Sequence, residues 1–323
     1  MNLMKRACLV FVAATLGWMA DGRASPPSPS SRTRGAVIES ARIADGARTV
    51  LLREIATARS EHPDAFKGLA ELRDALPELD AAKRGRFAPM TPALKAVGRM
   101  SIYPLLEELA FSAEPQGDLT NSAWLSWRVG LIEAVGSMRD PRAAPVLFAL
   151  LDAPSSDFLV MQAAAEAVAK LETDVAAARL IRLSRDHGVR RDAAVAGMGH
   201  CRTKPIVDRL VKILEEQPER ALAMHAIKSL GTAANAWVWE MPVMAGAPDQ
   251  AHVRETAVRA LVAAFVRWDG EVREKALHGI LVVDHPNTPE LLAAARKDAA
   301  TDELRAALDR LASRFEQNPL RTR

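Results

Sequence analysis

Residues 127–147 read WRVGLIEAVGSMRDPRAAPVL and contain the pattern that decides the fold. Their first half places apolar residues at helical spacing, three and four positions apart. Asp140-Pro141 follows, and aspartate is a common N-cap while proline is favoured at the first position of a helix. The segment therefore predicts two helices joined by a tight connection, which is a helical hairpin.

Similar segments recur about every 30 to 38 residues. They align on a residue near the end of a helix: Gly98, Gly136, Ala169, Gly199, Gly231 and Val262. The residue two positions earlier is always small: Ala96, Ala134, Ala167, Gly197, Ser229 and Ala260. Because small residues let two helices approach closely, this second column predicts the contacts between neighbouring repeats.

The repeats predict an all-α fold. One hairpin cannot bury its own apolar face, whereas stacked hairpins bury a continuous core. The composition agrees, since 49% of the residues are apolar but only 5% are aromatic, and a sheet would favour more aromatic residues. We therefore expect an α-solenoid of stacked helical hairpins.

The quoted segment resembles the HEAT-like repeat of the bilin-lyase type, V-R-x-x-A-(x)-A-L-G-x-L-x-D-P-R-A-x-P-x-L. Val189-Arg190-Arg191, Val253-Arg254 and Val272-Arg273 resemble its opening. The resemblance runs from about residue 90 to 300 and implies a HEAT-like or armadillo-like superhelix. Repeats of this kind occur in scaffolds, adaptors and a few enzymes, so the resemblance specifies the architecture more than the function. We expect a scaffold that binds another protein, because stacked repeats occur here together with an export signal and without a catalytic motif, as described below. The alternative is a lyase or isomerase of the bilin-lyase type acting on a chromophore or other ligand held in the solenoid groove.

The regular spacing of the repeats ends after Gly231. Residues 272–283 fit every column with Leu281 in the aligned position, only 19 residues after Val262. Either the helix at 251–267 lacks its own partner, or residues 234–250 are an insertion inside one repeat. Both interpretations stay open at this point.

The first 24 residues are typical of a secretory signal peptide. Lys5 and Arg6 precede an uncharged apolar stretch at 7–20, and the small residues around Ala24 predict cleavage after it. The apolar stretch would form a helix of about 21 Å, too short to span a bilayer core. We therefore expect the protein in the periplasm or outside the cell, with a retained signal as the alternative.

The remaining boundaries are expected to be a Pro/Ser-rich linker at 25–35, an N-terminal helical cap at 36–90, a HEAT-like solenoid at 91–316 and a C-terminal tail at 317–323. Within the cap, the pattern predicts helices over 36–59 and 64–79. No second hydrophobic stretch is long enough for a membrane span, so none is expected after cleavage.

Removal of the signal peptide lowers the formal charge of +3 to about +1, because Lys5, Arg6, Arg23 and Asp21 leave with it. Nucleic acid is therefore not an expected partner. Cys201 would be the one cysteine left, so no intramolecular disulfide is expected.

No residue pattern indicates catalysis, a cofactor or a metal. The seven histidines are scattered, and the chain has no H-E-x-x-H or C-x-x-C motif. Cys201 shares its column with apolar residues, which predicts a buried core residue. That column reads Met100, Met138, Leu171, Cys201, Ala233 and Ala264.

The segment 234–250 holds Trp237, Trp239, Met241 and Met244 without a clean helical period. By the resemblance, the second helix of each hairpin lines the concave face, and this segment falls there. Two tryptophans spaced by two residues point apart on a helix, so at least one should be available to a partner. The alternative is that the segment folds over its neighbour and buries both rings.

Arg128, Arg191, Arg254 and Arg273 share one column of the repeat. One interpretation is a stripe of guanidinium groups that binds an anionic partner surface. The other is a ladder of arginines paired with acidic residues in neighbouring repeats. The first interpretation makes Arg128, Arg191 and Arg254 candidate partner-binding residues.

Overall fold

The computed structural model describes residues 33–85, 87–98, 101–155, 157–244 and 246–318. The expected signal peptide, most of the linker and most of the C-terminal tail lie outside these ranges. Among the described residues the fold is all-α, with a single isolated bridge between Arg34 and Glu39 in place of any strand. None of the described helices is long and apolar enough to cross a membrane.

The α-helices are α1 (Asp45–Glu61), α2 (Pro63–Asp74), α3 (Leu76–Ala81), α4 (Met90–Ala96), α5 (Ile102–Ala110), α6 (Asn121–Met138), α7 (Ala144–Asp152), α8 (Phe158–Ala169), α9 (Asp174–Leu183), α10 (Val189–Gly197), α11 (Lys204–Glu215), α12 (Arg220–Ala233), α13 (Ala236–Trp239), α14 (Gln250–Arg267), α15 (Gly270–Val283), α16 (Thr288–Lys297) and α17 (Asp302–Glu316). Short 3₁₀ turns lie at Ser40–Arg42 (η1), Pro141–Ala143 (η3), Met198–His200 (η4) and Pro242–Met244 (η5).

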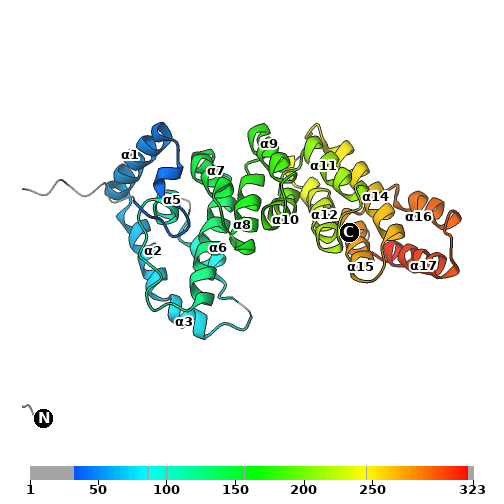
Figure 1. The fold of residues 1–323 in the computed structure, drawn as a ribbon, viewed down its shortest axis with the longest axis horizontal. Helices are drawn as coiled ribbons and strands as arrows, with labels where there is room; N and C mark the ends of the chain where they lie inside the picture. The colour runs from blue at the N-terminus through cyan, green and yellow to red at the C-terminus, as the bar shows by residue number, and fades with distance from the viewer. Residues whose placement is uncertain (1–32, 86, 99–100, 156, 245, 319–323) are drawn as a thin grey trace, which may run out of the picture. The chain divides into compact units, whose positions relative to one another are not determined.

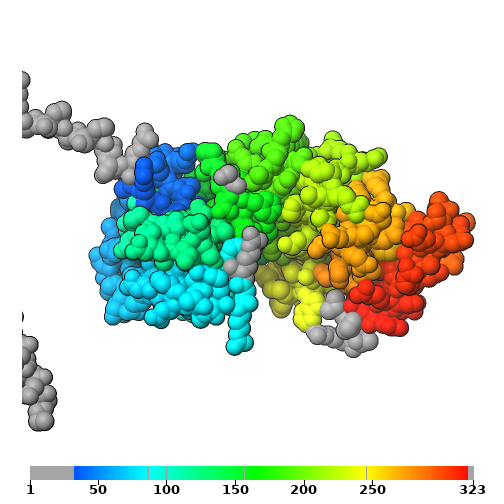
Figure 2. Space-filling view, turned by 60° about the horizontal axis from the view of Figure 1, so that its bottom comes forward, coloured from blue at the N-terminus to red at the C-terminus, as the bar shows by residue number. Residues whose placement is uncertain are grey.

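The repeat helices form two rows (Figure 1). The first row consists of α4, α6, α8, α10, α12 and α15, each packed on the next. The second row consists of α5, α7, α9, α11, α14 and α16, and all but the last pack against the following first-row helix. Successive units lie side by side in chain order (Figure 2). Each apolar face is therefore covered by the neighbouring unit, which makes this an α-solenoid as the repeat predicts.

Small residues set the spacing of the first row. A Cβ added at Gly136 would lie 2.6 Å from the Cβ of Ala167, and one added at Gly199 would lie 2.7 Å from the carbonyl oxygen of Ser229. Ala167 and Ser229 belong to the small-residue column of the following unit. The aligned residue of one unit therefore packs against the small residue of the next, which is the close contact that the column predicts.

The same contact shows which helix follows α12. A Cβ at Gly231 would lie 3.1 Å from the Cα of Gly279 on α15, whereas α14 packs in the second row between α11 and α16. The placement of Val262 in the aligned column is therefore wrong, because Val262 lies on α14. The apolar stripes of α14 and α15 look alike in sequence, and only their packing partners distinguish them. Residues 234–249 are thus an insertion inside one repeat.

The prediction of a first cap helix over 36–59 is wrong at its start, since α1 begins at Asp45. Residues 36–38 instead donate backbone hydrogen bonds to the end of α5. The N–H of Ala36 lies 2.7 Å from the carbonyl oxygen of Glu108, for example. Because these donors are satisfied by another helix, the segment has no need of helical hydrogen bonds of its own.

The second cap helix predicted over 64–79 is divided at Ala75 into α2 and α3. Pro77 lies in the first turn of α3. Proline has no N–H to donate to the preceding turn, so it ends one helix and starts another.

Candidate partner-binding surfaces

The insertion exposes one of its two tryptophans. Trp239 is 4% exposed, and its indole N–H donates to the carbonyl oxygen of Ala233 at 2.8 Å. Trp237 is 48% exposed, on the other side of the short helix α13, which Asn235 caps. The expectation that at least one of the two rings lies outside the core is therefore confirmed. The alternative in which both are buried is wrong.

Two further side chains of the insertion are exposed. Met241 is 48% exposed and Val243 is 79% exposed, whereas Met244 is partly buried against the core. We call Trp237, Met241 and Val243 the insertion surface. Val243 is not predicted from the sequence, because Pro242 interrupts any helical period around it. Trp239, a predicted partner-binding candidate, instead lies in the core.

The C-terminal end of the insertion is held against α11. The carboxylate of Asp249 accepts a hydrogen bond from the backbone N–H of Lys204 at 2.9 Å. Nearby, Nε2 of His252 lies 2.6 Å from Oδ1 of Asp208. With Ala236 and Trp239 buried near the other end, the segment is attached to the solenoid on both sides of its exposed residues. The segment is a connection between α12 and α14, not the second helix of a hairpin as the resemblance suggested.

Arg128 and Arg191 bridge neighbouring units. Arg128 lies 2.9 Å from Asp157, the N-cap residue of α8, and Arg191 pairs with Glu219, the N-cap residue of α12. These are contacts between first-row helices of adjacent repeats. They match the interpretation of the column as a ladder of intramolecular ion pairs.

Arg254 lies in the other row and does not join this ladder. It donates to the backbone carbonyl oxygens of Val283 at 2.9 Å and Asp284 at 3.3 Å, at the end of α15. The structure therefore does not bring Arg128, Arg191 and Arg254 together in one stripe. Whether any of them contacts a partner stays a prediction.

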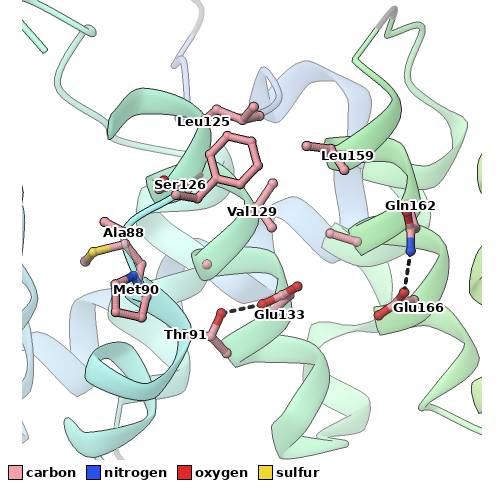
Figure 3. A pocket seen from close by; sticks show the side chains of 14 residues that line it. Ala88, Met90, Thr91, Leu125, Ser126, Val129, Glu133, Leu159, Gln162 and Glu166 are labelled. Atoms are coloured by element: carbon pink, nitrogen blue, oxygen red, sulfur yellow. Dashed lines mark hydrogen bonds between the residues drawn. The ribbon is translucent and has the colours of Figure 1, made fainter. Parts of the chain in front are cut away.

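A groove of about 300 Å³ lies across the first-row helices α4, α6 and α8 (Figure 3). Its lining includes apolar side chains at one end, Leu125, Val129 and Leu159, and polar side chains at the other, Thr91, Glu133, Gln162 and Glu166. This groove is not predicted from the sequence. The spacing of four residues from Leu125 to Val129 to Glu133 puts these side chains on one face of α6. That spacing does not say whether a neighbour covers the face.

The floor of the groove is tightly packed. A Cβ at Gly130 would lie 2.7 Å from the Cβ of Met90, so α4 rests directly on α6 at this point. Met90 and Ala163, which also line the groove, are buried. The groove is therefore a feature of close helix packing and is formed before any partner binds.

The two groove carboxylates are held by neutral donors. The hydroxyl of Thr91 donates to Glu133, and the side-chain amide of Gln162 donates to Oε1 of Glu166 at 2.9 Å. Nε2 of His200 lies 3.7 Å from Oε2 of Glu166. Burial, with help from nearby cations, lowers the pKa of His200 to about 4. The imidazole is therefore neutral at pH 7 and does not compensate the charge of Glu166.

Cys201 is fully buried, as its column predicts, and its Sγ lies 3.8 Å from the hydroxyl of Thr203. Burial raises the pKa of its thiol to about 11, which disfavours the reactive thiolate. Within the described ranges no three His, Cys, Asp or Glu side chains are grouped as metal ligands.

Residues 125–199 match the family model of HEAT repeats. The matched segment extends from within α6 to η4 and includes most of the groove. Together with the stacked hairpins, the match supports a HEAT-like repeat architecture. The match names HEAT repeats in general and does not distinguish the bilin-lyase type. Comparison with curated proteins gives no match.

Proposed function

We propose that the protein is an exported HEAT-repeat scaffold that binds another protein through the insertion surface. The observation that carries this proposal is Trp237, an aromatic side chain 48% exposed on a segment attached at both ends. Tryptophan is enriched among the residues that dominate binding energy, because a large rigid ring loses little entropy when it is buried. Met241 adds a flexible apolar side chain that adapts to an irregular surface.

Export is proposed from the residues at the start of the chain. The basic residues, apolar stretch and small residues of segment 1–24 support a cleaved signal peptide. We expect mass spectrometry of the protein recovered from its producing cells to find Ser25 at the N-terminus. An N-terminus at Met1 would contradict cleavage, and recovery from the cytoplasm alone would contradict export.

Partner binding is tested by photo-crosslinking in the producing cells. A benzoylphenylalanine at position 237 or 243 should give a discrete adduct with one partner protein. The same residue at position 175 is the control, because Val175 is 56% exposed on α9, in a repeat that does not contain the insertion. Equal adducts at 175 and 237, or none at 237 and 243, would contradict binding through this surface.

Truncation of the ring should then weaken the captured complex. Trp237→Ala should lower affinity by about tenfold or more, as truncation of an aromatic hot spot does. Val175→Ala serves as the matched exposed control. An unchanged affinity for Trp237→Ala would remove the insertion surface from the interface.

A further inference from the structure

The groove over α4, α6 and α8 combines an apolar wall with two carboxylates. Leu125 and Val129 on α6 and Leu159 on α8 form the wall. Glu133 and Glu166 lie at the other end, in the lower part of Figure 3. Among the described residues, no lysine, arginine or histidine lines the groove itself. Its own lining is therefore negatively charged.

The end of the groove that carries Glu133 and Glu166 can accept a further cation. Lys170 lies close enough to Glu133 and Glu166 for their charges to raise its pKa, although the opposing effect of burial is larger. Lys95 and Arg139 also act on the pKa of Lys170, and Arg139 is paired with Glu172. Among the described residues, no lysine or arginine lies within ion-pair distance of Glu133 or Glu166. His200 is neutral at pH 7, for the reason given above. Each carboxylate has about four acceptor positions, and the neutral donors Thr91 and Gln162 occupy only one on each.

We propose that this groove binds a short segment of a partner polypeptide in which an aliphatic or aromatic residue stands next to a lysine or arginine. The apolar side chain packs against Leu125, Val129 and Leu159. The ammonium or guanidinium group lies near Glu133 and Glu166. A volume of about 300 Å³ is at the lower end for a ligand pocket, which suits one or two side chains of an extended segment.

This inference rests on the proposed function, because it assumes a polypeptide partner, but it concerns a different surface. The insertion surface has an exposed tryptophan and no carboxylate pair, and it lies on the connection between α12 and α14. The groove lies on α4, α6 and α8. The two surfaces can therefore be inactivated separately.

The test uses an array of immobilised nonapeptides whose two central residues vary over an otherwise Gly/Ser sequence. One central residue is Leu, Phe or Ser, and the other is Lys, Arg, Glu or Ser. The purified, labelled full chain should be retained about fivefold more on Leu-Lys and Phe-Arg peptides than on Leu-Glu or Ser-Lys peptides. The preference over Leu-Glu should shrink in high salt, because the ion pairs are partly exposed to water.

The double variant Glu133→Gln/Glu166→Gln should lose the preference for Lys and Arg over Glu while keeping a preference for Leu over Ser. Glu274→Gln is the matched control, since Glu274 is an exposed carboxylate on α15. Circular dichroism shows whether each variant is folded. Equal retention on basic and acidic peptides by the native chain would overturn the inference, as would a basic preference that survives in the double variant.

The same variants distinguish failure of this inference from failure of the proposed function. Trp237→Ala should leave the array preferences unchanged. If the crosslink at position 237 forms and the array shows no preference, the groove proposal is wrong and the insertion surface stands. If the array preference appears without a crosslink, the insertion surface is wrong and the groove stands.

Discussion

The repeats from α6 to α10 are regular, whereas the repeat that contains α12 and α14 is interrupted by residues 234–249. Despite this interruption the first row continues in the same register. Gly136 meets Ala167 in the regular region, and Gly231 meets Gly279 across the interrupted one. The insertion changes the connection between rows and leaves the contact between first-row helices in place.

This comparison shows where a solenoid tolerates added sequence. Neighbouring units interact mainly through the small-residue contacts and apolar faces of their helices, so stability depends on those contacts. A longer connection at a row end costs only a slowly growing loop entropy. The connection is therefore free to carry exposed apolar side chains, and the insertion surface lies there.

The largest expected effect tests whether the insertion is packed onto the solenoid. Trp239→Ala should lower the free energy of unfolding by about 3–5 kcal/mol, because it empties a buried site and removes the hydrogen bond to Ala233. Urea unfolding followed by circular dichroism measures the change. A loss below about 1 kcal/mol would mean that the insertion contributes little to the fold.

The first-row contacts come next. The close contact made by Gly136→Ala should cost about 1–3 kcal/mol, because the added Cβ would lie 2.6 Å from that of Ala167. The roughly 1 kcal/mol that alanine gains over glycine in a helix offsets part of this cost. Gly231→Ala should cost less, since the nearest atom lies at 3.1 Å. Gly46→Ala is the control, with nothing within 4 Å. The same urea titration decides, and a larger cost at Gly231 than at Gly136 would contradict the shared register.

The partly buried His200, which follows α10 at the end of the regular region, should make the free energy of unfolding depend on pH. Burial lowers the pKa of His200 from 6.5 to about 4, so below pH 6.5 the unfolded chain binds a proton that the folded chain does not. Stability should therefore fall by roughly 1–2 kcal/mol between pH 6.5 and 4, after allowance for the partial exposure of the ring.

His200→Gln isolates this contribution, because glutamine does not titrate. The stability difference between the native chain and the variant, measured by urea unfolding at each pH, should change across the window from pH 6.5 to 4. Glu107 and Glu108 act in the opposite sense, because burial raises their pKa values, but both chains share them. A constant difference across the window would show that His200 is not protected from protonation.

The smallest expected effect is at the exposed side of the insertion. Trp237→Ala and Met241→Ala should each lower the free energy of unfolding by no more than about 1–2 kcal/mol, because about half of each side chain is already exposed in the folded protein. Thermal melts measured beside Trp239→Ala provide the comparison. A cost at Trp237 close to that at Trp239 would mean that both rings are structural, and the binding proposal would lose its basis.

Much of the fold follows from local spacing. Apolar residues three and four apart predict the helices, and the small column at Ala167 and Ser229 predicts the close contacts, because both depend on helix geometry alone. The same geometry predicts that Trp237 and Trp239 point apart. It could not say which ring is buried, because that depends on what lies beside α13.

The sequence by itself thus determined an all-α repeat, its hairpins and the positions where adjacent units touch. These features depend on the spacing of apolar residues and on residue size, and both can be read directly from the sequence. Only the tertiary structure decided that α15, and not α14, follows α12 in the first row. Both helices have apolar stripes, and the choice depends on the approach of Gly231 to Gly279. The groove has the same origin, since the face of α6 that carries Val129 and Glu133 is left uncovered only by how α4 and α8 pack around it.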